Sequence, residues 1–397
     1  MKMTRTELKN SEFWKNAGIV LPSYDVEAIT IKAKNEPRWV HFGIGNIFRI
    51  FLGSIADGML ENGDLDCGLT CIETFDFDII DKIYEPFDNL ALAVILNGDG
   101  TRDNKVLGCF AEAIKAQSGD AEKWNRMKQI FSSKSLQMIS FTITEKGYAL
   151  RDSEGKILAY VASDMEKGPE AVTGAMGIVT SMLWERFQNG AYPLALVSMD
   201  NCSHNGDLLR ASVTEMAEAW EKRGFVTKEF VAYVEDQDKV SFPWTMIDKI
   251  TPRPSEEIAQ DLKNAGVEGL DPVVTGKRTY IAPFINAEKP QYLVIEDRFP
   301  NGRPALEKGY GVYMTDRETV NKAERMKVTA CLNPVHSGVG PLGVVMGVEG
   351  FADLLDDPVM MKMGKMIAYQ ESMPVIEDPK IISPKDFADE LFNDRFV

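Results

Sequence analysis

The sequence predicts an α/β fold with a doubly wound parallel sheet in its N-terminal part, followed by a mainly α-helical C-terminal part. Two observations predict this class. Short apolar runs alternate with helical patterns along the first half of the chain, which is typical of buried parallel strands joined by crossover helices. From Asp316 onward most of the chain has helical spacing and is rich in Met and Leu.

The first predicted strand covers residues 38–44 and ends in glycine. It leads directly into residues 45–60, which keep the spacing of a helix and so predict a strand, a tight turn and a helix. The further apolar runs lie at residues 68–73, 90–96, 136–144 and 191–201, with helical patterns at residues 78–87 and 121–131 between them.

The pattern changes near the segment EDQDKVSFP, residues 235–243, after which loops and short extended pieces rich in proline follow. A chain of 397 residues is long enough for two domains. We therefore expect an N-terminal domain at residues 1–235 and a mainly helical domain at residues 236–397.

Composition excludes several classes of protein. The net charge of −16 argues against a nucleic-acid partner, which would need a basic face. The five cysteines are scattered without a CxxC pair, which fits a reducing compartment and argues against a disulfide framework or a structural zinc site. We find neither an apolar run of membrane-helix length nor a signal peptide. We expect a cytoplasmic protein, a monomer or small homo-oligomer, with a small-molecule substrate.

The segment HFGIGNIFR, residues 41–49, predicts a dinucleotide site at the end of the first strand. Gly43 and Gly45 would let the backbone turn tightly and approach a pyrophosphate, with the N-terminus of the next helix supplying free N–H groups. The third glycine of the usual fingerprint is absent, so an ordinary strand–helix turn is the alternative. Arg49 could add charge near phosphate or face solvent. The candidate cofactor-binding residues here are Gly43, Gly45, Asn46, Ile47, Phe48 and Arg49.

The second strand ends in the segment CIETFD, residues 71–76. A carboxylate at this point can bond the adenosine ribose hydroxyls and would repel a 2′-phosphate, so Glu73 favours NAD over NADP. Asp76 is the rival for this role, and an ordinary surface acid after a strand is the alternative.

The segment MKVTACLNPVHSGVG, residues 326–340, places Lys327, Asn333 and His336 in one apolar, helix-like run. Oxidation of a secondary alcohol by hydride transfer needs a base for the hydroxyl proton and donors for the developing alkoxide. A buried lysine and an asparagine amide can supply these. Asn201, just past another predicted strand, lies where open α/β sheets bind ligands. A solvated helix face is the alternative.

The sequence resembles the polyol-specific long-chain dehydrogenase family, which includes mannitol 2-dehydrogenases and the fructuronate and tagaturonate reductases. Six motifs, in order along most of the chain, carry the resemblance: HFGIGNIFR, FTITEKGY, SMDNCSHNG, FPWTMIDKITP, YLVIEDRFPNGRP and KVTACLNPVH. The resemblance implies an NAD-binding Rossmann-type domain, a largely helical domain and no catalytic metal.

The resemblance also implies roles for single residues. Lys327 would be the general base, Asn201 and Asn333 would hold the oxyanion, and His336 would orient the substrate. Thr144, Glu145 and Lys146 would lie beside the nicotinamide end of the cofactor. Asp200 would support the substrate site, and Lys249 and Arg303 are candidates for substrate contact or for structural ion pairs.

One departure from the family concerns spacing. The family has five steps from the lysine to the asparagine, whereas Lys327 and Asn333 are six steps apart and Lys327 and His336 are nine. At about 100° per residue, nine steps put two side chains on opposite faces of a regular helix. Pro334 cannot donate a hydrogen bond to the carbonyl of Ala330. We therefore expect a π-type bulge ahead of Pro334 that absorbs the extra residue.

The run MKVTACLNPVH is most similar to the fructuronate reductase branch, also named D-mannonate oxidoreductase, so D-mannonate and D-fructuronate are the expected substrates. Mannitol 2-dehydrogenase and tagaturonate reductase are the alternatives within the family, and a non-catalytic dinucleotide sensor is the alternative outside it. Candidate cations for the substrate carboxylate are Arg253, Lys277, Arg278, Arg298 and Arg303.

Overall fold

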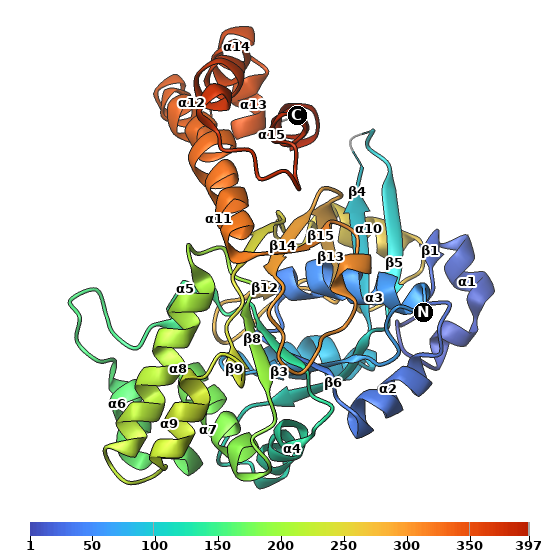
Figure 1. The fold of residues 1–397 in the computed structure, drawn as a ribbon. Coiled ribbons are helices and arrows are strands. Elements are labelled where there is room, and N and C mark those ends of the chain that lie inside the picture. The colour runs from blue at the N-terminus through green and yellow to red at the C-terminus, as the bar shows by residue number, and fades with distance from the viewer. Residues whose placement is uncertain (98, 349, 396–397) are drawn as a thin grey trace.

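The structure, a computed structural model, describes residues 1–97, 99–348 and 350–395. Its central element is a six-stranded sheet in which all neighbouring strands run parallel (Figure 1). Chain order runs outward in both directions from β2, so the sheet is doubly wound as predicted. In spatial order the strands are β6 (Phe110–Lys115), β3 (Leu69–Glu73), β2 (Trp39–Phe42), β7 (Met138–Phe141), β8 (Leu194–Ser198) and β9 (Val240–Ser241).

Both faces of this sheet are covered, and every residue of β2, β3, β7 and β8 is therefore buried. Trp39 and Met138 pack on one face with α3 (Gly53–Glu61). Val40 and Phe42 pack on the other face with four helices that lie together in the lower part of Figure 1. These helices are α4 (Ala121–Ser132), α7 (Ala175–Gln188), α8 (Asn205–Glu221) and α9 (Lys228–Glu235).

A second sheet includes two strands that lie between β3 and β6 in the chain, together with β1 and β13. Its order is β1-β5-β4-β13, and β4 and β5 form an antiparallel hairpin. The strand expected at residues 90–96 is therefore real but belongs to this separate sheet, and β6 completes the doubly wound one. The bounds are β1 (Ile19–Val20), β4 (Ala91–Leu96), β5 (Arg102–Leu107) and β13 (Phe284–Glu288).

The strands after residue 235 are hydrogen-bonded to earlier parts of the chain or to one another. β9 is the outermost strand of the central sheet, and β13 pairs with β4. A third sheet has the order β10-β14-β15, and β11 and β12 form a small hairpin. A domain boundary between residues 235 and 236 stays a prediction. The strands that follow this point precede the mainly helical part of the chain. The bounds are β10 (Thr245–Asp248), β11 (Val273–Val274), β12 (Tyr280–Ile281), β14 (Tyr292–Glu296) and β15 (Val312–Thr315).

The C-terminal part is mainly helical, as predicted, and α11 leads to it from the third sheet (Figure 1). Its core is continuous with that sheet, because Trp244, Met246 and Val294 pack with side chains of the helices. The helices are α11 (Arg317–Arg325), α12 (Asn333–Met346), α13 (Phe351–Leu355), α14 (Pro358–Met366) and α15 (Pro384–Glu390).

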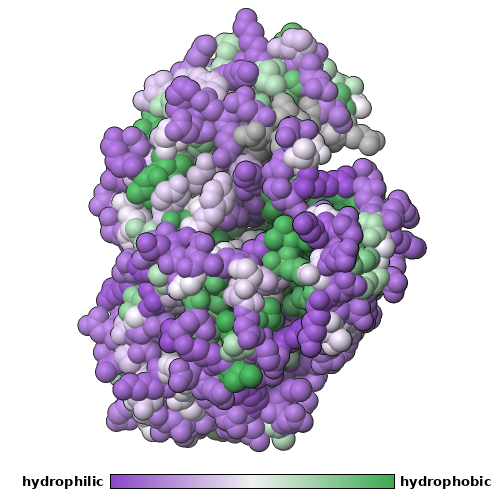
Figure 2. Space-filling view, turned by 90° about the vertical axis from the view of Figure 1, so that its right-hand side faces the viewer, coloured by the Kyte–Doolittle hydropathy of each residue, from purple (hydrophilic) through white to green (hydrophobic). Residues whose placement is uncertain are grey.

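The remaining helices lie at the periphery of the sheets. In the described part of the chain, no helix combines the length and the apolar character that crossing a membrane requires. The face drawn in Figure 2 is mainly hydrophilic, with hydrophobic residues in small groups. The helices at the periphery of the sheets are α1 (Ser11–Asn16), α2 (Val26–Asn35), α5 (Thr144–Tyr148), α6 (Ala159–Lys167) and α10 (Glu256–Asn264).

Candidate active site

The glycine turn lies between β2 and a helix that starts at residue 46. Gly43 has a φ of +88°, and a Cβ there would lie 2.2 Å from the carbonyl oxygen of Thr142, so the turn requires glycine. A Cβ on Gly45 would meet open space. The backbone at Gly45 is therefore accessible to a pyrophosphate at the N-terminus of the helix, and these residues fit a dinucleotide.

Phe48 occupies the position of the missing third glycine, which normally lets the helix pack closely on the strand. The helix is π-type over Phe48–Leu52 before it continues as α3. The fully buried Phe48 ring stacks on His41 of β2 with 3.9 Å between centroids, and Ile47 beside it is half-buried. The aromatic side chain therefore packs in the core, and Phe48 offers a cofactor its backbone alone.

Arg49 is fully buried, so of the two alternatives for this residue, charge near a phosphate or exposure to solvent, the second is wrong. Its guanidinium donates to Asn46 Oδ1 at 2.7 Å and to the carbonyl of Ala282 at 2.8 Å. Asn46 in turn donates to the carbonyl of Tyr280 at 3.2 Å. Burial lowers the pKa of Arg49 to about 10. The two side chains tie the end of the β11–β12 hairpin to the glycine turn, and their hydrogen bonds leave Arg49 directed away from a phosphate.

Glu73 ends β3 beside the glycine turn. Its Oε1 accepts hydrogen bonds of 2.9 to 3.2 Å from the backbone N–H groups of residues 74–76, and its Oε2 accepts from Ile44 N–H at 3.2 Å. Burial raises the pKa of this carboxyl group. The bond to Ile44 holds the acid next to the turn where a dinucleotide would lie, and Oε2, with a single donor, can still accept from a ribose hydroxyl.

Asp76, the rival of Glu73, is directed elsewhere. Its Oδ2 accepts from the hydroxyl groups of Thr275 and Thr279, both at 2.6 Å, which anchors the β11–β12 hairpin. A cavity of about 470 Å³ lies past the carboxyl ends of β3 and β6, lined by residues 74, 77, 116–120 and 172–173. Because the adenosine half binds on this side of a doubly wound sheet, the cavity would accommodate adenine, and Glu73 and Asp76 each directly precede a residue that lines it.

We expect Glu73→Ser to raise the ratio of kcat/KM for NADPH to that for NADH by roughly tenfold. The substitution removes a negative charge that would face the 2′-phosphate, and tenfold corresponds to about 1.4 kcal/mol of lost repulsion. Steady-state kinetics with both cofactors measures the ratio, with Asp76→Ser as the matched control. A ratio that rises only in the Asp76 variant would assign the ribose contact to Asp76.

The loops after β7 and β8 meet at the same edge of the sheet. Thr144, Glu145 and Lys146 follow β7 and are exposed. Asp200 follows β8, and its carboxylate accepts from Ile143 N–H at 2.9 Å and Thr144 N–H at 3.0 Å. Burial raises the pKa of Asp200. The hydrogen bonds of Asp200 are therefore with the protein, although it also lines the cavity described below.

Lys327 is 3% exposed, and its side chain contacts residues that precede it by 79 to 126 positions in the chain. Its Nζ lies 3.2 Å from Asn201 Oδ1, 2.5 Å from the carbonyl oxygen of Ile247 and 3.5 Å from Asp248 Oδ1. Asp248 is equally buried, at 4% exposed. The structure thus brings together Lys327 and Asn201, which the resemblance placed in one site.

A π-type turn over Met326–Cys331 separates α11 from α12, and the bulge predicted ahead of Pro334 is confirmed. The N–H of Leu332 donates to the carbonyl of Lys327, five residues earlier, at 3.0 Å. Pro334 lies in the first turn of α12, where a missing N–H leaves no helical hydrogen bond unmade. The wider turn absorbs the extra residue between Lys327 and Asn333.

A cavity of about 190 Å³ lies at the Lys327 side chain. Three segments line it, namely residues 200–203 after β8, residues 245–247 of β10, and residues 324, 327–328, 332 and 333 of the helical part. Asn201, Lys327 and Asn333 are all among them. An amine and two side-chain amides at one cavity beside the carboxyl edge of the sheet can hold a carbonyl or hydroxyl oxygen and move a proton to or from it.

Sequence reasoning missed three residues of this site. Ile247 and Asp248 contact the lysine ammonium, and Glu324 lines the cavity. The motif FPWTMIDKITP contains Ile247 and Asp248, but the residue predicted from this motif was Lys249, which directly follows Asp248.

The comparisons with known proteins agree with this geometry. A family model described as the mannitol dehydrogenase Rossmann domain matches residues 37–308. The chain is 45% identical over 396 residues to the D-mannonate oxidoreductase of Thermotoga maritima, and the match covers 100% of this chain and 73% of that protein. The chain belongs to the mannitol dehydrogenase family. The family predicted from the six motifs is therefore confirmed, and this chain is an oxidoreductase.

Two further proteins to which the chain is similar are more distant. The chain is 28% identical over 397 residues to the polyol:NADP oxidoreductase of Gluconobacter oxydans, with 98% of this chain and 74% of that protein covered. It superposes with a TM-score of 0.78 on the Pseudomonas fluorescens mannitol 2-dehydrogenase solved with NAD and D-mannitol. That match is 23% identical and covers 100% of this chain and 74% of the other, and it shows the shared fold.

Three residues that the resemblance to the mannitol dehydrogenase family singled out lie outside this cavity. His336 is exposed on α12, one turn past Asn333, and its ring packs edge-on against Phe351 with 4.3 Å between centroids. Burial of part of the ring lowers its pKa. Lys249 donates from its ammonium group to the carbonyl of Glu288. Arg303 is the third predicted residue that lies outside the cavity.

Arg303 forms the structural ion pairs that were the alternative to substrate contact. Its guanidinium makes bonds of 2.8 and 2.9 Å to Asp297 and one of 2.5 Å to Glu307. Of the other cations considered for a carboxylate, Arg298 is paired with Asp238 at 3.5 Å, and Lys277 lies over the ring of Phe75 at 4.8 Å. Arg298 and Lys277 therefore both contact other side chains of the protein.

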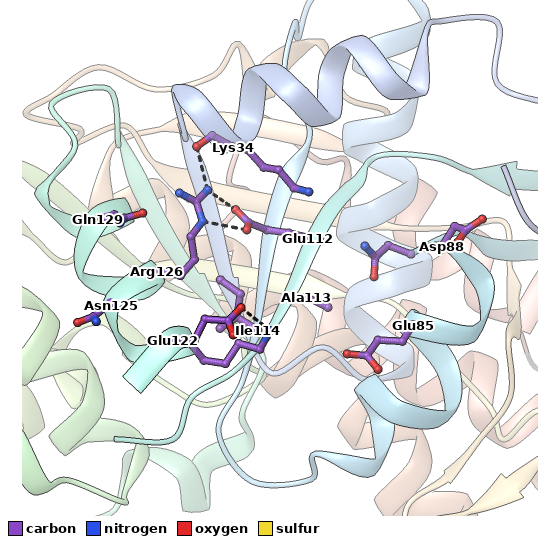
Figure 3. Close-up of a pocket in the computed structure, with 12 residues that line it drawn as sticks. Lys34, Glu85, Asp88, Glu112, Ala113, Ile114, Glu122, Asn125, Arg126 and Gln129 are labelled. Carbon is purple, nitrogen blue, oxygen red and sulfur yellow. Dashed lines mark hydrogen bonds and ion pairs between the residues drawn. The ribbon is translucent and has the colours of Figure 1, made fainter. Parts of the chain in front are cut away.

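A larger cavity, of about 760 Å³, lies beside β6 at the outer edge of the central sheet (Figure 3). Arg126 spans part of it, bonded to Glu112 and to the carbonyl of Lys34. The cavity lies away from the carboxyl ends of the strands, so we do not assign the reaction to it. Among the described residues, no group of three or more His, Cys, Asp and Glu side chains could hold a metal ion.

Proposed function

We propose that the chain reduces D-fructuronate to D-mannonate with NADH and oxidises D-mannonate with NAD in the reverse direction. The observation that carries this proposal is the buried Lys327 ammonium at a cavity that it shares with Asn201 and Asn333. The 45% identity to a protein named D-mannonate oxidoreductase supports this choice of sugar acid.

Lys327 serves as the general acid in reduction and the general base in oxidation. A lysine ammonium carries three N–H donors, and Asn201 Oδ1 and the carbonyl of Ile247 accept two of them. Lys327 also lines the cavity in which a substrate oxygen would lie. Asp248, at 3.5 Å, favours the charged ammonium before the proton is given up.

Asn201 and Asn333 hold the oxygen on which negative charge develops. Because Asn201 Oδ1 accepts from Lys327, its NH₂ group is the end that is left to donate to that oxygen. Asn333 lines the same cavity from the start of α12. Preorganised donors of this kind stabilise a developing alkoxide more than the neutral carbonyl. His336 would orient the substrate from beyond Asn333.

NAD(H) is the cofactor and supplies or accepts the hydride when bound. Gly43 and Gly45 would hold its pyrophosphate at the helix N-terminus, and Glu73 would accept from the adenosine ribose hydroxyls. The carboxylate of Glu73 supports NAD over NADP, although the Gluconobacter relative is named for NADP.

The substrate proposal is tested by the oxidation of NADH with D-fructuronate, D-tagaturonate and D-fructose in parallel, followed at 340 nm. We expect kcat/KM for fructuronate to exceed that for the other two by at least tenfold. A preference for fructose would favour a mannitol 2-dehydrogenase, and a preference for tagaturonate would favour its reductase. Bound NADH without turnover of any of the three would favour a dinucleotide sensor.

We also propose a cytoplasmic protein that is a monomer or a small homo-oligomer. The five cysteines are all free, and four of them are buried, which suits a reducing compartment.

A further inference from the structure

Thr144 has an unusual backbone conformation at the cofactor side of the site. Its φ is +63°, in the left-handed region that a β-branched residue rarely adopts. Such a conformation costs about 1–3 kcal/mol and persists where neighbouring groups impose it. The adjoining loop touches the glycine turn, because Thr142 Oγ1 donates to the carbonyl of Gly43 at 2.7 Å. The strained residue therefore lies beside the cofactor site.

Asp200 is the group that imposes this conformation. It accepts the N–H groups of Ile143 and Thr144, the two that directly precede the strained φ rotation of Thr144. A third bond, of 2.6 Å, comes from the Tyr148 hydroxyl, which is also 2.9 Å from Ser198 Oγ at the end of β8. Three donors converge on the carboxylate of Asp200, and all three belong to the protein.

The segment after β8 that contains Asp200 also contacts the proposed catalytic lysine. Asn201, the next residue, contacts the Lys327 ammonium at 3.2 Å. The segment that follows β8 therefore contacts two parts of the site. Asp200 holds the loop after β7, and Asn201 contacts Lys327. In a doubly wound sheet the nicotinamide half binds over the strands on this side of the switch point.

We propose that Asp200 is a positioning residue, and that its carboxylate holds Thr144 in the left-handed turn that aligns the nicotinamide with Lys327. This role replaces the substrate contact expected from the sequence. It rests on the proposed active site, but it makes its own prediction for cofactor binding without any substrate.

The test is a double-mutant cycle of Asp200→Asn and Thr144→Gly, read by fluorescence titration with NADH and by competition with ADP-ribose, which lacks the nicotinamide. Asparagine has one acceptor oxygen and would direct an N–H toward a backbone N–H. We expect Asp200→Asn to weaken NADH binding at least tenfold and ADP-ribose binding less than twofold. In the Thr144→Gly background the same substitution should weaken NADH binding less than threefold, because glycine adopts the turn without help.

Three outcomes would overturn the proposal: an equal loss of NADH affinity in both backgrounds, a parallel loss of ADP-ribose affinity, or an unchanged NADH affinity in Asp200→Asn. If Asp200→Asn does not fold, Tyr148→Phe removes one donor to the carboxylate and should weaken NADH binding about threefold, again less in the Thr144→Gly background. These titrations need no turnover, so they are independent of the keto-sugar assay.

Asp57→Asn is the matched control. Asp57 is also a fully buried carboxylate that accepts a tyrosine hydroxyl, from Tyr24, and a backbone N–H, from Gly108. It lies on α3, toward the second sheet and away from the loops after β7 and β8. We expect this variant to melt at a lower temperature while the ratio of NADH to ADP-ribose affinity stays the same.

Discussion

Replacement of Lys327 with alanine is expected to lower kcat by about a thousandfold or more, while the affinity for NADH stays within about twofold. General acid–base catalysis by a positioned side chain contributes about 10²- to 10⁴-fold to a rate. The lysine also carries charge that the alkoxide needs, and alanine supplies neither function. The ammonium contacts Asn201, Ile247 and Asp248, which lie away from the glycine turn, so NADH binding should persist. Single-turnover rates with NADH and fructuronate, together with NADH titrations, measure the two effects.

Lys105→Ala is the matched control for this prediction. Lys105 is likewise paired with a buried carboxylate, Asp57, but lies on β5 in the second sheet. It should alter the melting temperature and leave kcat unchanged. Small primary amines added to Lys327→Ala should restore part of the rate. Loss of NADH binding in that variant, with kcat at saturation preserved, would contradict the assignment of Lys327 as the acid and base.

Substitution of Asn201 with aspartate is expected to lower kcat by about 10²- to 10³-fold, with a smaller change in KM. Removal of one oxyanion donor has this size of effect in other enzymes. Aspartate keeps an oxygen for the Lys327 ammonium but has no NH₂ group, and its charge opposes the charge that develops on the substrate oxygen. Steady-state kinetics with fructuronate measures both constants.

Asn189→Asp makes the same chemical change on the exposed end of α7, where the amide donates to Glu185. It should leave both constants unchanged. A rise in KM at constant kcat in Asn201→Asp would show that the amide binds the ground state, and the alkoxide contact would then belong to Asn333 alone.

The sequence predicted the centre of the fold because β2, β3, β7 and β8 are buried on both faces and are therefore continuous apolar runs. It missed β6, an edge strand whose segment FAEAIK is partly exposed and includes charged residues. It found β4 but could not say which sheet contains it, since an apolar run records burial and not the identity of the neighbouring strand.

The same distinction applies to the candidate site. Lys327, Asn201 and Asn333 were found because their motifs occur in a recognisable order, and the bulge was found from a count of residues. The sequence left two alternatives for Arg49 because an arginine on a helix can face water, whereas here neutral oxygen atoms accept from it inside the protein. Asp248 and Glu324 were missed because only the fold brings Asp248 to the Lys327 ammonium and Glu324 to the cavity.

The proton donor and the nucleotide-binding elements lie on opposite sides of the junction at α11. Lys327 follows α11, whereas Asn201, Ile247 and Asp248 precede it. A fragment truncated ahead of residue 317 would retain the glycine turn and Glu73 yet have no amine to protonate a product. On the proposed function, recognition of the coenzyme and chemical conversion therefore depend on different segments of the chain, which meet at the Lys327 cavity.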